Sequence, residues 1–156
     1  MTEYFILKFL HVIGATVLIG TGAGIAFFML MAHRTGEAAT VAAVARIVVI
    51  ADWLFTATAV VVQPITGTLL VWKTGLSLNE GWVSWSLLLY LIIGCFWLPV
   101  VWMQSRMRDL ARAAADKGEP LPPDYHYLFR WWFVCGIPAF AAILAIVWLM
   151  ITRPAL

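Results

Sequence analysis

Residues 4–31 read YFILKFLHVIGATVLIGTGAGIAFFMLM, and this stretch decides which class of protein the chain belongs to. The run is longer than the about 20 residues that a helix needs to cross a hydrocarbon core of about 30 Å. It is also longer than the about 7–15-residue apolar core of a secretory signal sequence, and no Ala-x-Ala cleavage site follows a short core. We therefore predict a retained membrane span that carries one lysine, Lys8, and one histidine, His11.

The rest of the chain extends this pattern to four spans, at about 4–32, 46–72, 82–105 and 128–151. The composition agrees, because 63% of the 156 residues are hydrophobic and only 12% are charged, against about half and a quarter in soluble domains. Only helices or closed barrels satisfy their backbone groups in a bilayer, and the alternation typical of barrel strands is absent. The sequence predicts an all-α four-helix transmembrane bundle, up-down-up-down, with residues 1–156 as one domain.

Three connections of unequal length join the spans, at about 33–46, 73–81 and 105–127. We expect the third helix to continue to about Ala115, because Gly118 and the prolines at 120, 122 and 123 end it. The first and third connections share one side of the membrane, and together with Arg130 just beyond the third they hold seven basic residues: Arg34, Arg46, Arg106, Arg108, Arg112, Lys117 and Arg130. The other side holds Lys8, Lys73 and Arg153. Because cytoplasmic loops are enriched in Lys and Arg, we expect both termini outside.

His11 lies about two turns inside the first span, and Gly14, Leu18 and Gly22 share its face at helical spacing. A membrane histidine either hydrogen-bonds a neighbouring helix or binds a metal or haem iron. The small residues leave room for a flat group, either a tryptophan from another helix or a porphyrin. His33 is 22 residues further on, about 33 Å along a helix. A haem on His11 therefore needs a non-histidine sixth ligand, an open site or a second subunit.

Other polar side chains inside the spans are candidates because such groups are costly in a membrane. We expect Gln63 and Tyr90 near His11 in the outer half of the bilayer, and Asp52 and Gln104 in the inner half. Asp52 needs a partner, and the inner half also holds three arginines that bind carboxylates bidentately. Those arginines are Arg46, Arg106 and Arg130. The alternatives for Asp52 are an ion pair that staples helices, a proton relay, or an anchor for an acidic ligand.

The segments FILKFLHVIGATVLIGTGAGIAFFMLMAHR (5–34), WLPVVWMQSRMRDLA (97–111) and RWWFVCGIPAF (130–140) resemble an uncharacterised family of small bacterial four-helix membrane proteins. That family is distantly similar to the CopD-like and HemJ-type membrane proteins. HemJ-type protoporphyrinogen oxidases begin with a similar K-x-L-H helix, so the resemblance implies that His11 is an axial ligand of haem b. Arg46 loosely matches an arginine of theirs. Ser86 stands where they have a lysine, so the protoporphyrinogen reaction is not implied.

Together these observations lead us to expect a haem-b-binding redox protein of the bacterial inner membrane, an oxidoreductase related to HemJ-type proteins. His11 would bind the iron, with Gly14 and Gly22 accommodating the macrocycle. The three arginines would meet haem propionates or an acidic ligand. Because His11 lies in the outer half of the bilayer and the arginines lie in the inner half, one haem cannot reach both, and we treat them as two separate sites. Whether the chain is an enzyme stays open.

Two alternatives come from other classes of protein. The first is a carrier or channel lined by Asp52, Gln63 and Gln104. The second is a small structural subunit that associates with a partner or a second copy through Gly20 and Gly24, a small-xxx-small pair. The expected surroundings are the lipid bilayer. A nucleic-acid partner is not expected, because the basic residues are scattered rather than massed in a patch.

Overall fold

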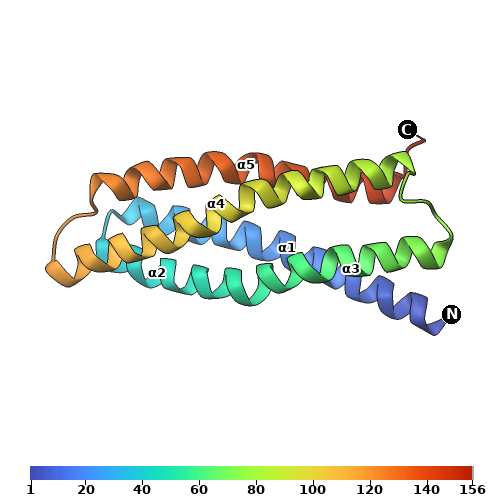
Figure 1. Cartoon of the computed structure of the whole chain (residues 1–156). Coiled ribbons are helices and arrows are strands. Elements are labelled where there is room, and N and C mark those ends of the chain that lie inside the picture. Colours follow the sequence, from blue (N-terminus) through green and yellow to red (C-terminus); the bar gives the residue numbers. More distant parts are fainter. Residues whose placement is uncertain (156) are drawn as a thin grey trace.

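The computed structural model describes residues 1–155 and consists of four long helical segments (Figure 1). The first is α1 (Thr2–Thr35), and the second combines α2 (Ala38–Ala51), a π-helical segment η1 (Asp52–Thr56) and α3 (Ala57–Thr74). The third and fourth are α4 (Gly81–Lys117) and α5 (Pro123–Thr152). All four are long and apolar enough to cross a membrane, and residues 1–155 contain no strand. The prediction of an all-α, up-down-up-down bundle is confirmed.

Several helices begin or end outside the predicted spans, at the end of the bundle away from the termini. The first connection shrinks to Gly36 and Glu37, so the expectation of a loop over 33–46 was wrong. Gly36 ends α1 with a left-handed φ of 70°, and the alanine-rich segment that follows is a strong helix former. Gly118 ends α4 in the same way, with a φ of 68°, close to the predicted position. Pro123 starts α5 at the first helical position, where a proline has no hydrogen bond to lose.

The two ends of the bundle differ in what they carry. Both termini lie at one end, together with the connection between α3 and α4 (Figure 1). We call this the termini end. The opposite end holds the Gly36 turn and the connection between α4 and α5, and it carries the seven basic residues counted in the sequence. We call this the basic end.

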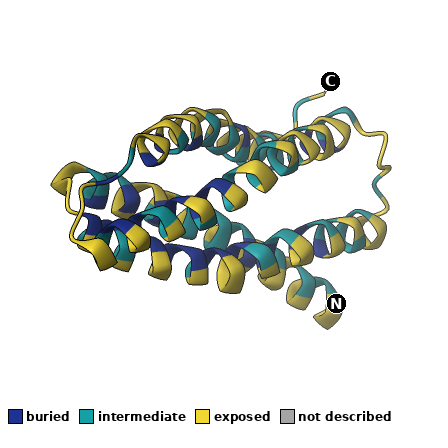
Figure 2. Ribbon diagram, turned by 60° about the vertical axis from the view of Figure 1, so that its left-hand side comes forward, coloured by how far each residue is buried: buried dark blue, intermediate teal, exposed yellow. Residues whose placement is uncertain are grey.

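The apolar core lies toward the basic end, where side chains of all four helical segments meet. Met29, Val41, Met107, Ala111 and Tyr125 are completely buried there. Figure 2 shows the same distribution, with buried ribbon concentrated away from the termini. Toward the termini end the buried side chains include polar ones, and large apolar side chains such as Phe9 and Leu91 are exposed. This half therefore presents its apolar surface outward, as expected for helices in lipid.

The second helical segment is much longer than a bilayer requires. Ala38–Thr74 has 37 residues, about 55 Å at 1.5 Å per residue, which is far more than a hydrocarbon core of about 30 Å. Asp52 and Lys73 are 21 residues apart, or about 31 Å. Lys73 pairs with Glu3 at 2.5 Å at the termini end. If the hydrocarbon core lay between the levels of Asp52 and Lys73, much of the apolar core would lie in an extension beyond it.

Pro64 interrupts the hydrogen bonding of α3, and α4 compensates for it. A proline has no N–H, so the carbonyl four residues earlier loses its helical donor. That carbonyl belongs to Val60, and the Tyr90 hydroxyl of α4 donates to it. Tyr90, a residue singled out from the sequence, thus satisfies a backbone group that would otherwise be unpaired in the membrane.

Candidate functional site

His11 packs directly against α3 through a hydrogen bond of its imidazole. His11 Nδ1 lies 2.9 Å from Thr66 Oγ1. Thr66 Oγ1 also lies 2.8 Å from the Val62 carbonyl and 3.2 Å from the Gln63 carbonyl of its own helix. A threonine hydroxyl in a helix commonly donates to such a carbonyl, so we assign Thr66 as the acceptor and His11 Nδ1–H as the donor. The consequence is a lone pair on His11 Nε2, the atom that would bind a metal ion or accept a hydrogen bond.

Two glycines allow α1 and α3 to approach this closely. A Cβ atom added at Gly67 would lie 3.1 Å from His11 Cε1, so the imidazole rests on the bare backbone of α3. A Cβ atom at Gly14 would lie 3.2 Å from Gln63 Nε2. The Gln63 amide donates to the His11 carbonyl at 2.9 Å. Each glycine thus makes room for a polar side chain of the opposite helix.

Gln63 also carries an oxygen with no partner. Its side chain is buried, and Oε1 makes no hydrogen bond within residues 1–155. A buried amide oxygen left unpaired costs free energy. The contact between α1 and α3 therefore contains two acceptors without an assigned donor, the buried Gln63 oxygen and His11 Nε2.

The structure brings together most of the residues expected in this region. His11, Gly14 and Gln63 lie in one contact, and Tyr90 bonds one turn away at Val60. Gly22 lies apart from this contact, because a Cβ atom added there would meet no neighbouring heavy atom of residues 1–155 within 4 Å. Thr66 and Gly67 were missed by sequence reasoning. Their signal was the spacing from Gln63, because residues three and four positions apart share a helix face.

A second polar cluster surrounds Asp52, whose side chain is only 3% exposed. Trp97 Nε1 donates to Asp52 Oδ1 at 3.5 Å. The Gln104 amide satisfies both of its neighbours in one orientation, in which its nitrogen donates to Asp52 Oδ2 at 3.0 Å. Its oxygen then accepts from Trp132 Nε1 at 3.2 Å. Gln104, which the sequence placed at the same depth as Asp52, is thus one of its donors, and the two indoles complete the cluster from α4 and α5.

No basic side chain of residues 1–155 pairs with this carboxylate within 4.0 Å. The ion pairs of the described chain are Lys73–Glu3, Arg108–Asp109 and Arg112–Asp116. The three candidate arginines are all exposed on helix surfaces: Arg46, Arg106 and Arg130. They lie on the basic side of the Asp52 level. Asp52 and Thr66 are 14 residues apart, about 21 Å along the helix, so the arginines and His11 belong to different levels.

Asp52 opens the π-helical segment η1, in which the Ala57 N–H bonds to the Asp52 carbonyl five residues earlier. Such segments insert one residue into an α-helix and occur frequently at functional sites. Thr56 ends the segment and is buried, and its Oγ1 has no hydrogen-bond partner in the described chain. The Asp52 cluster therefore sits at an irregular point of the helix.

A third cluster, of aromatic and imidazole rings, lies at the basic end. His33 stacks on Phe129 with centroids 3.7 Å apart, and the His33 and His126 rings are 5.6 Å apart. These two histidines, from α1 and α5, are therefore neighbours at the basic end. His33 Nδ1 and the Tyr125 hydroxyl are buried without partners in residues 1–155. The same residues contain no group of three or more His, Cys, Asp and Glu that could hold a metal ion.

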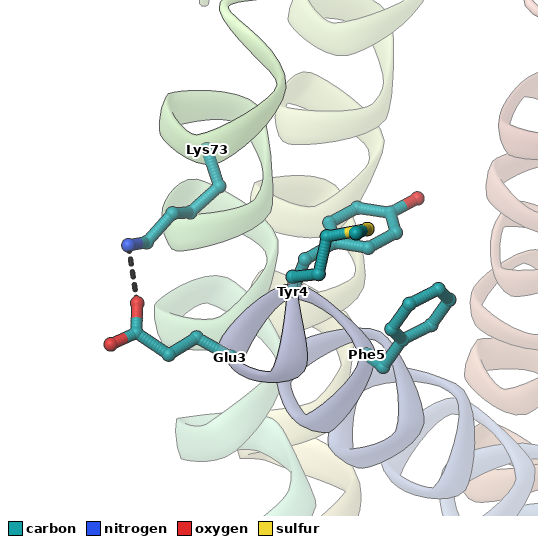
Figure 3. A pocket seen from close by; sticks show the side chains of 5 residues that line it. Glu3, Tyr4, Phe5 and Lys73 are labelled. Carbon is teal, nitrogen blue, oxygen red and sulfur yellow. Dashed lines mark hydrogen bonds and ion pairs between the residues drawn. The ribbon is translucent and has the colours of Figure 1, made fainter.

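A surface hollow of about 450 Å³ lies at the termini end and is separate from all of these clusters. It is lined by Met1, Glu3, Tyr4, Phe5 and Lys73. Figure 3 shows Glu3 reaching Lys73, while the Tyr4 and Phe5 rings extend away from the pair. None of the residues singled out from the sequence as candidate sites lines this hollow. Its shallow, exposed ion pair marks a helix end rather than a chemical site.

Comparison with known proteins identifies the chain at the level of a family. A family model described as "Predicted integral membrane protein (DUF2269)" matches residues 5–154, which include almost all of the four helical segments. No curated protein and no solved structure shows a significant match. The match agrees with the four membrane-length helices and assigns no activity.

Proposed function

We propose that the chain, which belongs to this family of integral membrane proteins, is a haem-b-binding redox protein in which His11 binds the iron. The observation that carries the proposal is the Thr66 bond, which leaves the His11 Nε2 lone pair free for a ligand. Histidines that bind metals usually donate their other ring N–H to a protein group that fixes their orientation. When bound, haem b would supply one-electron transfer.

The residues around His11 suit an axial ligand, and they also limit where the macrocycle can lie. Gln63 packs over Gly14, so no flat slot exists between α1 and α3 at that point. Gly22 is open, although it is 11 residues from His11, or about 16 Å along the helix. The macrocycle would therefore lie outside the α1–α3 contact, against lipid or a second copy of the chain. Thr66 would hold the imidazole, and Gln63 would offer its oxygen to a neighbouring donor.

The three arginines take a separate role in this proposal. Arg46, Arg106 and Arg130 are exposed near the Asp52 level, about 21 Å from the His11 level by helical rise. We assign them to the membrane boundary, where guanidinium groups bind lipid phosphates or an acidic ligand. By the excess of basic residues, the basic end faces the cytoplasm of a bacterial inner membrane.

An absorption spectrum of the protein, expressed with haem available and purified in detergent, tests the proposal. The wild-type protein should show a Soret band, and His11→Ala should lose it. Thr66→Val removes the orienting acceptor and should weaken haem binding by about 10–100-fold. Thr68→Val is the matched control, because Thr68 is exposed and bonds only to the Pro64 carbonyl of its own helix. A colourless wild-type protein, or an unchanged band in His11→Ala, would refute the proposal.

The structural-subunit alternative rests on a different face of α1. Gly20 is exposed, and no described heavy atom lies within 4 Å of an added Cβ there. A helix from a partner or from a second copy would find a bare backbone at this point. If the protein is colourless, then crosslinking in native membranes should capture a neighbouring chain, and Gly20→Leu should abolish the product. An unchanged product in Gly20→Leu would eliminate this face.

A further inference from the structure

The carboxylate of Asp52 is hydrogen-bonded by neutral donors only. The donors are the Trp97 indole at 3.5 Å and the Gln104 amide at 3.0 Å, and Gln104 in turn accepts from Trp132. Trp97 and Gln104 are seven residues apart on α4, which places them on one face of that helix. Three helical segments thus converge on one carboxyl group that is almost completely buried.

The ionisable groups on every element around Asp52 can be accounted for. On α1, residues 12–32 contain no ionisable side chain, and neither do residues 57–72 of α3. Arg46 on α2, Arg106 on α4 and Arg130 on α5 are exposed and form no ion pair with Asp52 within 4.0 Å. Two thiols lie near the cluster: Cys95, two residues from Trp97, is exposed, and Cys135, one turn from Trp132, is half-buried. The carboxyl group therefore has no counter-ion among residues 1–155.

A buried, ionised carboxylate without a counter-ion is costly, and a cation or a proton must compensate it. The surrounding atoms are N–H donors, which are unsuitable ligands for a metal cation. We propose that Asp52 is a proton-binding site at the membrane boundary, which takes a proton from water at the basic end and releases it again. One O–H bond forms at Oδ2 on uptake and breaks on release, and no other reactant is needed.

Gln104 couples this proton to α5. With Asp52 ionised, the amide nitrogen donates to Oδ2 and the amide oxygen accepts from the Trp132 indole. With Asp52 protonated, Oδ2 is a donor, so the amide turns over to present its oxygen. Its NH₂ group then faces the Trp132 N–H, donor against donor, and that hydrogen bond is lost. Trp132 is therefore hydrogen-bonded only while Asp52 is ionised.

Infrared difference spectroscopy on protein in lipid vesicles tests the site directly. With ¹³C-labelled aspartate, lowering the pH should produce the carboxylic C=O stretch of a buried acid, and Asp52→Asn should lose it. Asp109→Asn should retain the band, because Asp109 is exposed, as are Asp116 and Asp124. Absence of a buried-acid band across the pH range in which the wild-type protein is folded would overturn the proposal. A band retained in Asp52→Asn would do the same.

A second measurement needs no change at Asp52 and so remains valid if that variant fails to fold. With ¹⁵N-labelled tryptophan, the indole signal of Trp132, assigned through Trp132→Phe, should shift at the midpoint of the infrared band. Gln104→Leu should abolish the shift. A Trp132 signal that ignores pH while the band titrates would overturn the coupling. Both measurements are made on the wild-type protein and repeated in His11→Ala, where the same results would show that this site is independent of haem binding.

Discussion

The imidazole of His11 packs closely against Gly67, which has no side chain, and adding a single methyl group at Gly67 tests this contact. The Cβ of an alanine at Gly67 would lie 3.1 Å from His11 Cε1, so the ring or α3 would have to move. We expect Gly67→Ala to destabilise the protein by about 1–3 kcal/mol, the usual cost of overpacking. Thermal unfolding in detergent measures this, and haem affinity should fall with it.

Gly94→Ala is the matched control for that substitution. Gly94 is also inside a helix, and an added Cβ there meets no described heavy atom within 4 Å. Alanine is favoured over glycine in helices by up to about 1 kcal/mol. The two substitutions should therefore shift the unfolding midpoint in opposite directions. If both substitutions shift the unfolding midpoint by the same amount in the same direction, then the packing of His11 does not require a glycine at position 67.

At the scale of the helices, Tyr90 on α4 compensates for the hydrogen bond that Pro64 removes from α3. Tyr90→Phe removes the donor to the Val60 carbonyl, which Pro64 has already deprived of its helical donor. We expect a loss of about 1–3 kcal/mol in unfolding free energy, the cost of a buried polar group left unpaired. Unfolding of the variant in detergent or in bicelles measures this loss.

The double variant separates this explanation from a simple loss of packing. Pro64→Ala restores an N–H four residues after Val60, so the carbonyl regains its own donor. Tyr90→Phe should then cost much less in the Pro64→Ala background than in the wild-type chain. Costs that add without interaction would contradict the pairing of the two residues.

For the molecule as a whole, the distribution of basic residues predicts its direction in the membrane. The basic end carries seven Lys and Arg residues, against three toward the termini. We expect a C-terminal alkaline phosphatase fusion to be active and a C-terminal fluorescent-protein fusion to be dark in a bacterial host, because the C-terminus faces outward. The opposite pair of signals would reverse the orientation, and with it the side from which Asp52 would receive its proton.

The sequence predicted the large features of the fold because hydropathy and length determine them directly. Four apolar runs gave the four helices, and Gly118 marked the end of α4. The early start of α2 at Ala38 was not predicted, because the charged Arg46 was interpreted as the start of the second span, although residues 38–45 are themselves apolar. Nothing in the segment DWLFT signalled a π-helix.

The candidate sites were predictable in their residue types and less so in their partners. The cost of polar groups in lipid singled out His11, Asp52, Gln63, Tyr90 and Gln104, and all five make side-chain hydrogen bonds across helices. Thr66, Gly67 and Trp97 were missed. Their importance depends on how two helices are rotated and shifted against each other, which no single helix encodes.

The π-helical segment makes the second membrane helix tolerant of a change in length at one place. A π-turn holds one residue more than an α-turn, so the helix beyond Thr56 keeps roughly the phase that a regular helix would have. Deleting one residue within Asp52–Thr56 should let this turn become α-helical, with Thr66 still facing His11 and Val60 still facing Tyr90. The same deletion in the regular helix just beyond, at Ala57–Ala59, would turn both residues by about 100°. Within this helix, a residue can therefore be lost at the π-helical segment without reassembling the bundle.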